Sequence, residues 1–133
     1  MANEPKMIQY FETIEFIESM PNSVKSPYLA LTTQGWKFYI VAQSRGYCAY
    51  QWKTITIPQW VMKKPIGEQI WYFAHEMAHA YSPKDGMHGP EFMAQLIRIC
   101  PAEHIHWELT YKPRNAKAAG IREKDYIDTF SIL

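Results

Sequence analysis

The sequence predicts a single α+β domain in which a small antiparallel sheet packs against one long helix. Two patterns and the composition support this class. Bulky apolar side chains recur at every second position in parts of residues 35–57, and at helical spacing in residues 66–99. Hydrophobic residues make up 47% of the 133 residues, which is enough to fill one core. We therefore expect residues 1–133 to fold as one domain.

The N-terminal part is expected to hold one helix followed by a loop. Pro21 would end the helix, and Pro27 interrupts residues 22–34, where we expect irregular structure. The helix is predicted over residues 7–19 because apolar side chains recur there three and four positions apart. These apolar positions are Met7, Tyr10, Phe11, Ile14 and Ile17.

Two or three short strands are expected next. Residues 35–42 place large apolar side chains at alternate positions, which is typical of a strand. Ser-Arg-Gly at residues 44–46 marks a turn, and a second extended region covers residues 47–57 with a break near Trp52. Short strands joined by tight turns pair antiparallel, and such a sheet needs a helix to cover one face.

Two helices and a last strand complete the prediction. Residues 58–64 form a helical turn or connector, and residues 66–81 form the central helix, which Pro83 ends. Residues 90–100 form a second helix, which begins with a proline at its first position. We expect residues 105–111 to form one more strand.

The central helix carries His75, Glu76 and His79 with the spacing H-E-x-x-H, and His88 follows nine residues later. Histidines four residues apart lie on the same helix face, so both imidazoles can bind one metal ion. Zinc lowers the pKa of a bound water towards about 7, and the adjacent Glu76 can accept its proton. This pattern predicts a catalytic zinc site with Glu76 as general base.

His88 is the predicted third ligand, because a catalytic zinc ion has three protein ligands and one open position. It follows a helix stop and a turn, which lets the chain fold back beneath the metal. Asp85 and Glu91 are the alternatives, since carboxylates also bind zinc. Packing alone is a poor explanation for two stacked histidines beside a glutamate, because burying them is costly.

An oxyanion formed during amide hydrolysis needs a hydrogen-bond donor besides the metal. The sequence offers four candidates, each of which is more often structural than catalytic. They are Tyr47, His104, His106 and Tyr111.

Charge does not indicate a nucleic-acid partner, so DNA is kept only as an alternative, and hydropathy predicts no membrane partner. The 14 basic residues are nearly balanced by 13 acidic ones, and no apolar run approaches the roughly 20 residues that span a bilayer. The N-terminus resembles no secretion signal, and Cys48 and Cys100 form no CxxC motif, so we expect free thiols in the cytoplasm. A basic run near the C-terminus is read as solvated surface, with DNA contact as the alternative. It comprises Lys112, Arg114, Lys117, Arg122 and Lys124.

The segments HEMAHA at residues 75–80 and HGPEF at residues 88–92 resemble the minimal zincin metallopeptidases. The closest resemblance is to the SprT-like group and related small phage and bacterial metallopeptidases. In that group a last strand precedes the active helix, and ITIP at residues 55–58 occupies this place. The resemblance implies that His75, His79 and His88 bind zinc, that Glu76 is the general base, and that proteins, often near DNA, are hydrolysed.

The chain departs from the DNA-repair members of that group, because its second and third histidines are closer and no cysteine-rich zinc ribbon follows. The resemblance therefore does not extend to DNA association. We expect a zinc metallopeptidase that hydrolyses a protein or peptide substrate through a zinc-bound water activated by Glu76. Two alternatives use the same ligands: a binding protein that holds the metal without turnover, for instance a phage factor acting on a host protein, and a hydrolase of non-peptide amides.

Overall fold

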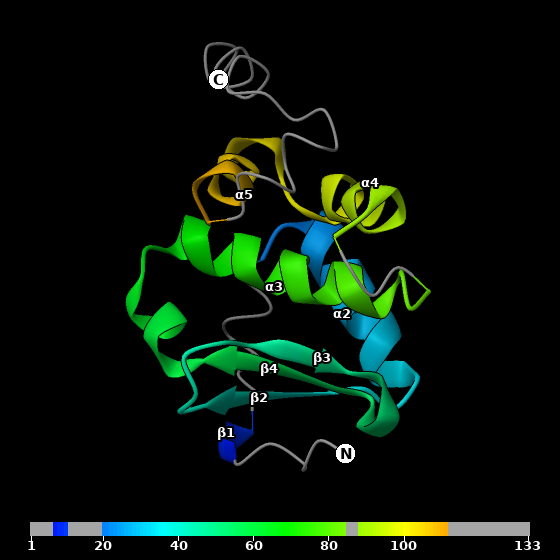
Figure 1. Cartoon of the computed structure of the whole chain (residues 1–133), viewed down its shortest axis with the longest axis vertical. Helices are drawn as coiled ribbons and strands as arrows, with labels where there is room; N and C mark the ends of the chain where they lie inside the picture. Colours follow the sequence, from blue (N-terminus) through cyan, green and yellow to red (C-terminus); the bar gives the residue numbers. More distant parts are fainter. Residues whose placement is uncertain (1–6, 11–19, 85–87, 112–133) are drawn as a thin grey trace.

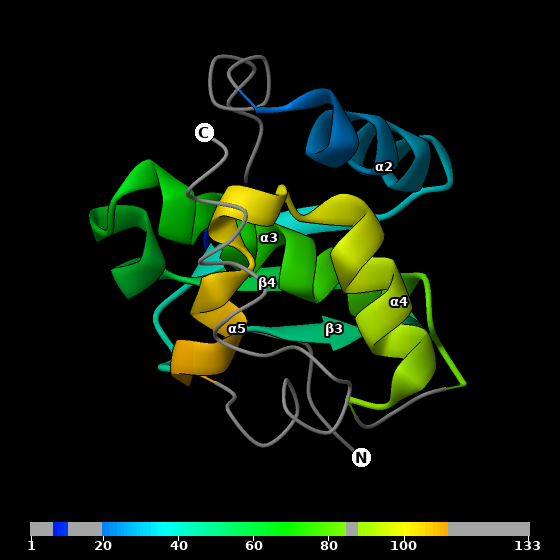
Figure 2. The same cartoon turned by 90° about the horizontal axis from the view of Figure 1, so that it is seen from above.

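The computed structural model describes residues 7–10, 20–84 and 88–111, whose elements lie in layers (Figure 1). A sheet forms one outer layer, and helix α3 (Ile66–Ala80) packs across it. Helices α4 (Pro90–Ile99) and α5 (His106–Tyr111) cover the other side of α3, as the view from above also shows (Figure 2). Helix α2 (Asn22–Thr33) packs against α3 and α4. The predicted α+β class is confirmed.

The sheet is mixed, so the prediction of an antiparallel sheet is wrong in one pairing. The strand order is β1 (Met7–Tyr10), β2 (Lys37–Val41), β4 (Thr54–Pro58) and β3 (Tyr47–Ala49). Strand β2 pairs parallel with β4, whereas the two outer pairs are antiparallel. The parallel pair arises because β3 takes the edge position and the chain then returns through β4 between β3 and β2. Strand β3 is therefore an edge strand of this sheet.

The predicted N-terminal helix is wrong at residues 7–10, where the spacing of the apolar residues is compatible with a helix or a strand. Residues 7–10 form strand β1 instead of the first turn of a helix. The three-residue spacing of Met7 and Tyr10 carries no information about which structure forms when so few residues take part. The remainder of the predicted helix, residues 11–19, lies outside the described residues.

Residues 22–34 were predicted to be a loop, but all except the last form helix α2. Pro27 lies in the second turn, where it removes one backbone hydrogen bond but is buried with Val24 and Leu31 on the packed face. The helix ends at Gly35, whose φ of 94° is left-handed. There Trp36 N–H donates to the Leu31 carbonyl at 3.0 Å and Gly35 N–H donates to the Thr32 carbonyl, which is a Schellman motif.

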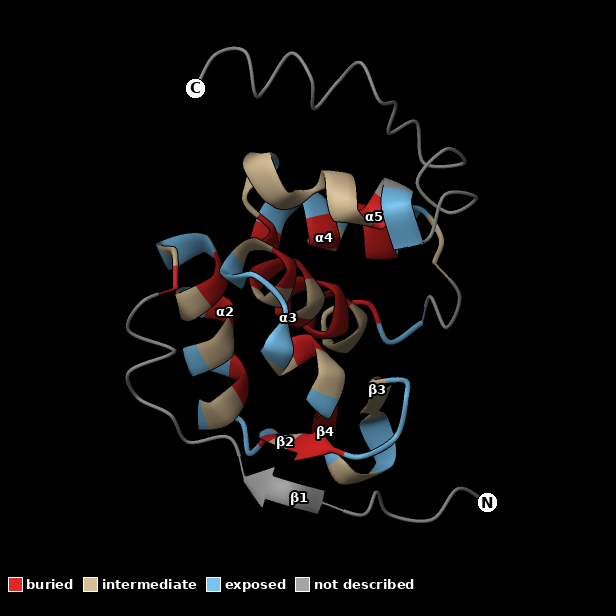
Figure 3. Ribbon diagram, turned by 90° about the vertical axis from the view of Figure 1, so that its left-hand side faces the viewer, coloured by how far each residue is buried: buried red, intermediate tan, exposed pale blue. Residues whose placement is uncertain are grey.

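Helix α3 matches its predicted bounds to within one residue. The Pro65 carbonyl accepts the first backbone hydrogen bonds of the helix, from Glu68 and Gln69. At the other end Ser82 Oγ donates to the Ala78 carbonyl at 2.6 Å, just before Pro83 stops the helix. Most of α3 is buried between the sheet and the other helices (Figure 3). The predicted apolar face is confirmed for Ile70, Phe73 and Met77, whereas Ile66 is exposed.

The predicted strand at residues 105–111 is wrong. A 3₁₀ helix, η3 (Ala102–His104), leads into α5, which packs on α3 and buries Glu108 completely. The other predicted elements are confirmed: β2, the interrupted pair β3 and β4, the turn η2 (Gln59–Lys63) and helix α4.

The remaining predictions concern the surface and the thiols. Cys48 is half-buried, Cys100 is buried, and both are free thiols, as expected. Within the described part of the chain, no helix has the length and apolar character needed to cross a bilayer. The basic run from Lys112 to Lys124 lies outside the described residues.

Candidate metal centre

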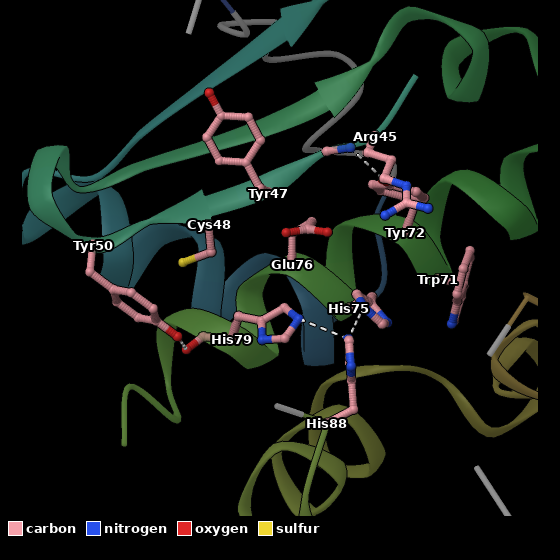
Figure 4. Close-up of a pocket in the computed structure, with 11 residues that line it drawn as sticks. Arg45, Tyr47, Cys48, Tyr50, Trp71, Tyr72, His75, Glu76, His79 and His88 are labelled. Atoms are coloured by element: carbon pink, nitrogen blue, oxygen red, sulfur yellow. Dashed lines mark hydrogen bonds between the residues drawn. The ribbon is translucent and has the colours of Figure 1, made fainter. Parts of the chain in front are cut away.

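Three imidazoles converge at the junction of α3 and the segment that enters α4 (Figure 4). His75 and His79 project from one face of α3, and His88 faces them from just before the first residue of α4. Nε2 of His88 lies 3.2 Å from Nε2 of His75 and 3.2 Å from Nε2 of His79. Metal-ligating atoms of all three lie within 4.8 Å of one another. The predicted three-histidine cluster is therefore assembled by the fold.

The spacing of these nitrogens fits a zinc ion. Two nitrogens bound to tetrahedral zinc at 2.0–2.1 Å lie about 3.3 Å apart, close to the separations observed here. Imidazole is also a donor that zinc prefers. Glu91, one alternative third ligand, is exposed at the start of α4 and is not part of the cluster. Asp85, the other alternative, lies outside the described residues.

Glu108 orients the first of these histidines from helix α5. Its Oε1 accepts a hydrogen bond from His75 Nδ1 at 2.8 Å and another from Trp71 Nε1 at 3.0 Å. An ionised carboxylate can only accept, so the hydrogen of this bond is assigned to Nδ1, and Nε2 of His75 faces the other two imidazoles. Glu108 was not predicted from the sequence, because its role depends on the docking of α5, a segment that was predicted to be a strand.

Glu76 lies on the wall of a pocket of about 320 Å³ between α3 and strand β3. The side chain is almost completely buried and points towards β3, beside the imidazole cluster (Figure 4). Burial, reinforced by the negative charge of Glu76, raises the pKa of both Tyr72 and Cys48. These two neighbours therefore stay protonated near neutral pH. The predicted base thus lines the same pocket as the three predicted metal ligands.

The pocket joins the two layers of the fold. One wall comes from the loop before β3 and from the strand itself, and the other from the face of α3 that bears the ligands. The lining residues are Arg45, Gly46, Tyr47, Cys48 and Tyr50 on the first side, and Trp71, Tyr72, His75, Glu76 and His79 on the second, with His88. Tyr50 also ties the sides together, because its hydroxyl donates to the His79 carbonyl.

Tyr72 presents a phenol hydroxyl to this pocket. The oxygen accepts a hydrogen bond from Gly46 N–H at 2.7 Å, and no described residue accepts the hydroxyl proton. Tyr72 precedes Glu76 by four residues, so the two side chains share a face of α3. That spacing is visible in the sequence, but the four donors predicted from the sequence all lie outside the helix.

The four predicted oxyanion donors occupy different places. Tyr47 lines the pocket, whereas His104, His106 and Tyr111 do not. The Tyr111 hydroxyl donates to Glu68 Oε2 at 2.9 Å. His106 Nδ1 lies 3.1 Å from the Glu103 carbonyl, which it contacts within its own segment. Structural contacts thus account for His106 and Tyr111, two of the three candidates that lie outside the pocket.

The chain matches no protein-family model, no curated protein and no solved structure. The interpretation of the site therefore depends on the geometry of its own residues, and the resemblance to the SprT-like zincins stays a prediction.

Proposed function

We propose that this chain is a zinc-dependent hydrolase of peptide bonds. The observation that carries the proposal is the convergence of three imidazole Nε2 atoms beside a buried glutamate on the wall of a pocket. A zinc ion held by His75, His79 and His88 would act as a Lewis acid, which lowers the pKa of water and polarises a carbonyl. The protein side chains supply proton transfer and orientation.

Glu76 is assigned the proton transfers. In the attack on the peptide carbonyl it would take a proton from water, and it would then deliver that proton to the departing amine. Its neighbours support this role, because Tyr72 and Cys48 have raised pKa values and do not compete as bases near neutral pH. The buried position strengthens electrostatic interactions with a developing charge.

Tyr72 is assigned the stabilisation of the oxyanion. Its hydroxyl oxygen is occupied by Gly46 N–H, which leaves the hydroxyl proton to be donated into the pocket. Such a donor stabilises negative charge that develops on the carbonyl oxygen. Tyr47, the one earlier candidate that lines the pocket, lies on strand β3, whereas Tyr72 lies one turn from Glu76 on α3.

Strand β3 supports a peptide as the substrate. It is an edge strand, and Tyr47 and Cys48 on it line the pocket. An extended peptide can pair with the edge of a sheet through backbone hydrogen bonds, which orients a scissile bond along the pocket. A small non-peptide amide has no use for such an edge, so the peptidase is favoured over a hydrolase of other amides.

The test compares zinc content and hydrolysis of an internally quenched peptide library in three variants. Glu76→Gln should keep zinc and lose at least about 100-fold in kcat, because general-base catalysis contributes factors of this size. His79→Ala should lose both zinc and activity. Glu91→Gln is the matched control, because Glu91 is exposed on α4, and it should change neither. Full activity in Glu76→Gln would refute the mechanism, and zinc-loaded wild-type protein without hydrolysis would instead support a binding protein.

A further inference from the structure

The loop between β2 and β3 is anchored on both sides of Arg45. The Ser44 carbonyl accepts a hydrogen bond from Trp60 Nε1 at 2.8 Å, and Gly46 N–H donates to the Tyr72 hydroxyl at 2.7 Å. Trp60 and Tyr72 also pack edge to face, with ring centroids 5.9 Å apart. The backbone of Arg45 is therefore fixed relative to α3, although its side chain is exposed.

Gly46 lets this loop come close to the helix. A Cβ atom at this position would lie 2.3 Å from the Thr56 carbonyl oxygen and 2.9 Å from the Tyr72 ring. Both distances are shorter than van der Waals contact, and the first involves backbone that cannot move aside. The contact that presents Arg45 thus depends on a residue without a side chain.

The Arg45 side chain lines the pocket beside Tyr72 (Figure 4). Its charge acts on that phenol, because it opposes the effects of burial and of Glu76 that raise the pKa of Tyr72. The ion pairs among the described residues involve histidines and glutamates, and none includes Arg45. A guanidinium held at the pocket without a protein carboxylate offers a fork of donors to an anionic ligand.

The distance from Arg45 to the metal ligands can be estimated along helix α3. Tyr72, which marks the Arg45 end, precedes the ligands His75 and His79 by three and seven residues on α3. With a rise of 1.5 Å per residue, that end lies about 4–10 Å along the helix axis from the metal ligands. One residue of extended peptide covers about 3.5 Å, and a glutamate side chain carries its carboxylate further, so a carboxylate on the residue next to the scissile bond falls within this range.

We infer that Arg45 forms an anion subsite which selects peptides carrying a carboxylate next to the scissile bond. The guanidinium binds the carboxylate through paired hydrogen bonds, the geometry in which arginine recognises this group. The carboxylate belongs either to an aspartate or glutamate side chain or to the C-terminus of the peptide. This selectivity rests on the proposed hydrolase function, and the experiment separates the two.

The hydrolysis test uses internally quenched peptide libraries in which each position next to the scissile bond is fixed as glutamate, glutamine or lysine. Wild-type protein should prefer glutamate at one of these positions by about tenfold in kcat/KM, the lower end for a hydrogen bond to a charged group. Arg45→Gln should abolish the preference, so that the glutamate and glutamine peptides are cleaved with equal kcat/KM. Arg45→Glu should reverse it in favour of lysine. Lys37→Gln, which removes an exposed positive charge on β2, is the matched control.

A binding test has no need of turnover and identifies the source of the carboxylate. Zinc-loaded Glu76→Gln protein is titrated calorimetrically with alanine pentapeptides that are acetylated and amidated and carry a central glutamate or glutamine. A third peptide, all alanine with a free C-terminus, represents the terminal carboxylate. Tighter binding of the glutamate peptide or of the peptide with a free C-terminus than of the glutamine peptide, lost when Arg45→Gln is added, assigns the subsite to a side chain or to a chain end respectively.

The outcomes are distinct. Hydrolysis without carboxylate preference, or an equal loss on all peptides in Arg45→Gln, overturns the subsite and leaves the hydrolase proposal standing. Absence of hydrolysis together with Arg45-dependent binding of a carboxylate peptide overturns the hydrolase and keeps the subsite. If the protein neither hydrolyses the libraries nor binds the carboxylate peptides through Arg45, both proposals are wrong.

Discussion

Glu108 offers the sharpest test of how the fold supports the metal site. The residue is completely buried and accepts hydrogen bonds from His75 Nδ1 and Trp71 Nε1 with one oxygen. Glu108→Ala removes the acceptor of both donors and frees the imidazole of His75 to rotate or change tautomer. We expect weaker zinc binding although no zinc ligand has been changed.

The expected loss is 10- to 100-fold in zinc affinity, the range for residues that orient a metal-ligating histidine. This corresponds to about 1.4–2.7 kcal/mol of binding free energy. The zinc-free protein should be destabilised as well, by about 2–6 kcal/mol, because two buried donors lose their acceptor at roughly 1–3 kcal/mol each. Glu108→Gln keeps an acceptor oxygen and should fall between Glu108→Ala and the wild type in both measurements.

The assay is a competition titration of zinc against a chromophoric chelator, combined with urea unfolding of the zinc-free protein. Glu103→Ala is the matched control, because Glu103 lies on η3 in the same segment but is partly exposed, and it should bind zinc like the wild type. A folded Glu108→Ala protein with unchanged zinc affinity would refute the role assigned to Glu108.

Three further predictions concern the pocket and the helices around it. Tyr72→Phe should lower kcat by about 100-fold or more on acidic and neutral peptides alike, as for loss of an oxyanion donor; unchanged steady-state kcat would exclude that role. Gly46→Ala should lower the free energy of unfolding by about 1–3 kcal/mol in urea titrations, because its Cβ meets the Thr56 carbonyl; equal stability would show that the loop relaxes. Burial lowers the pKa of His106 below 6.5, so the unfolded chain binds more protons as pH falls through 6.5, and stability should fall there. His106→Gln should flatten this pH dependence in thermal unfolding; an unaltered slope would assign it to other groups.

Local patterns in the sequence were sufficient to predict an element where a long segment has one clear hydrophobic period and strong end signals. Helix α3 has both, since its apolar face repeats and Pro83 stops it, and this helix alone places His75, Glu76 and His79. Their convergence with His88 also followed from the short turn between the two helices.

Tertiary contacts decided the elements that were predicted wrongly. Helix α2 forms in spite of Pro27, because that residue is buried with its apolar neighbours and Gly35 closes the helix in a Schellman motif. The parallel pairing of β2 and β4 depends on β3 taking the edge, which no local pattern specifies.

The residues that support the site could not be predicted from the sequence, because tertiary contacts also decide where they lie. Glu108 becomes a partner of His75 only when α5 docks on α3, and Arg45 becomes part of the pocket only when its loop is anchored to Tyr72 and Trp60. Sequence spacing reveals groups that share one helix, whereas groups brought from other elements require the packed structure.

The most direct test of the metal site is the zinc content of purified wild-type protein measured beside that of His88→Ala. Three converging imidazoles predict one zinc per wild-type chain and loss of bound zinc in the variant, with both proteins folded by circular dichroism. Equal zinc in His88→Ala would contradict the three-histidine site.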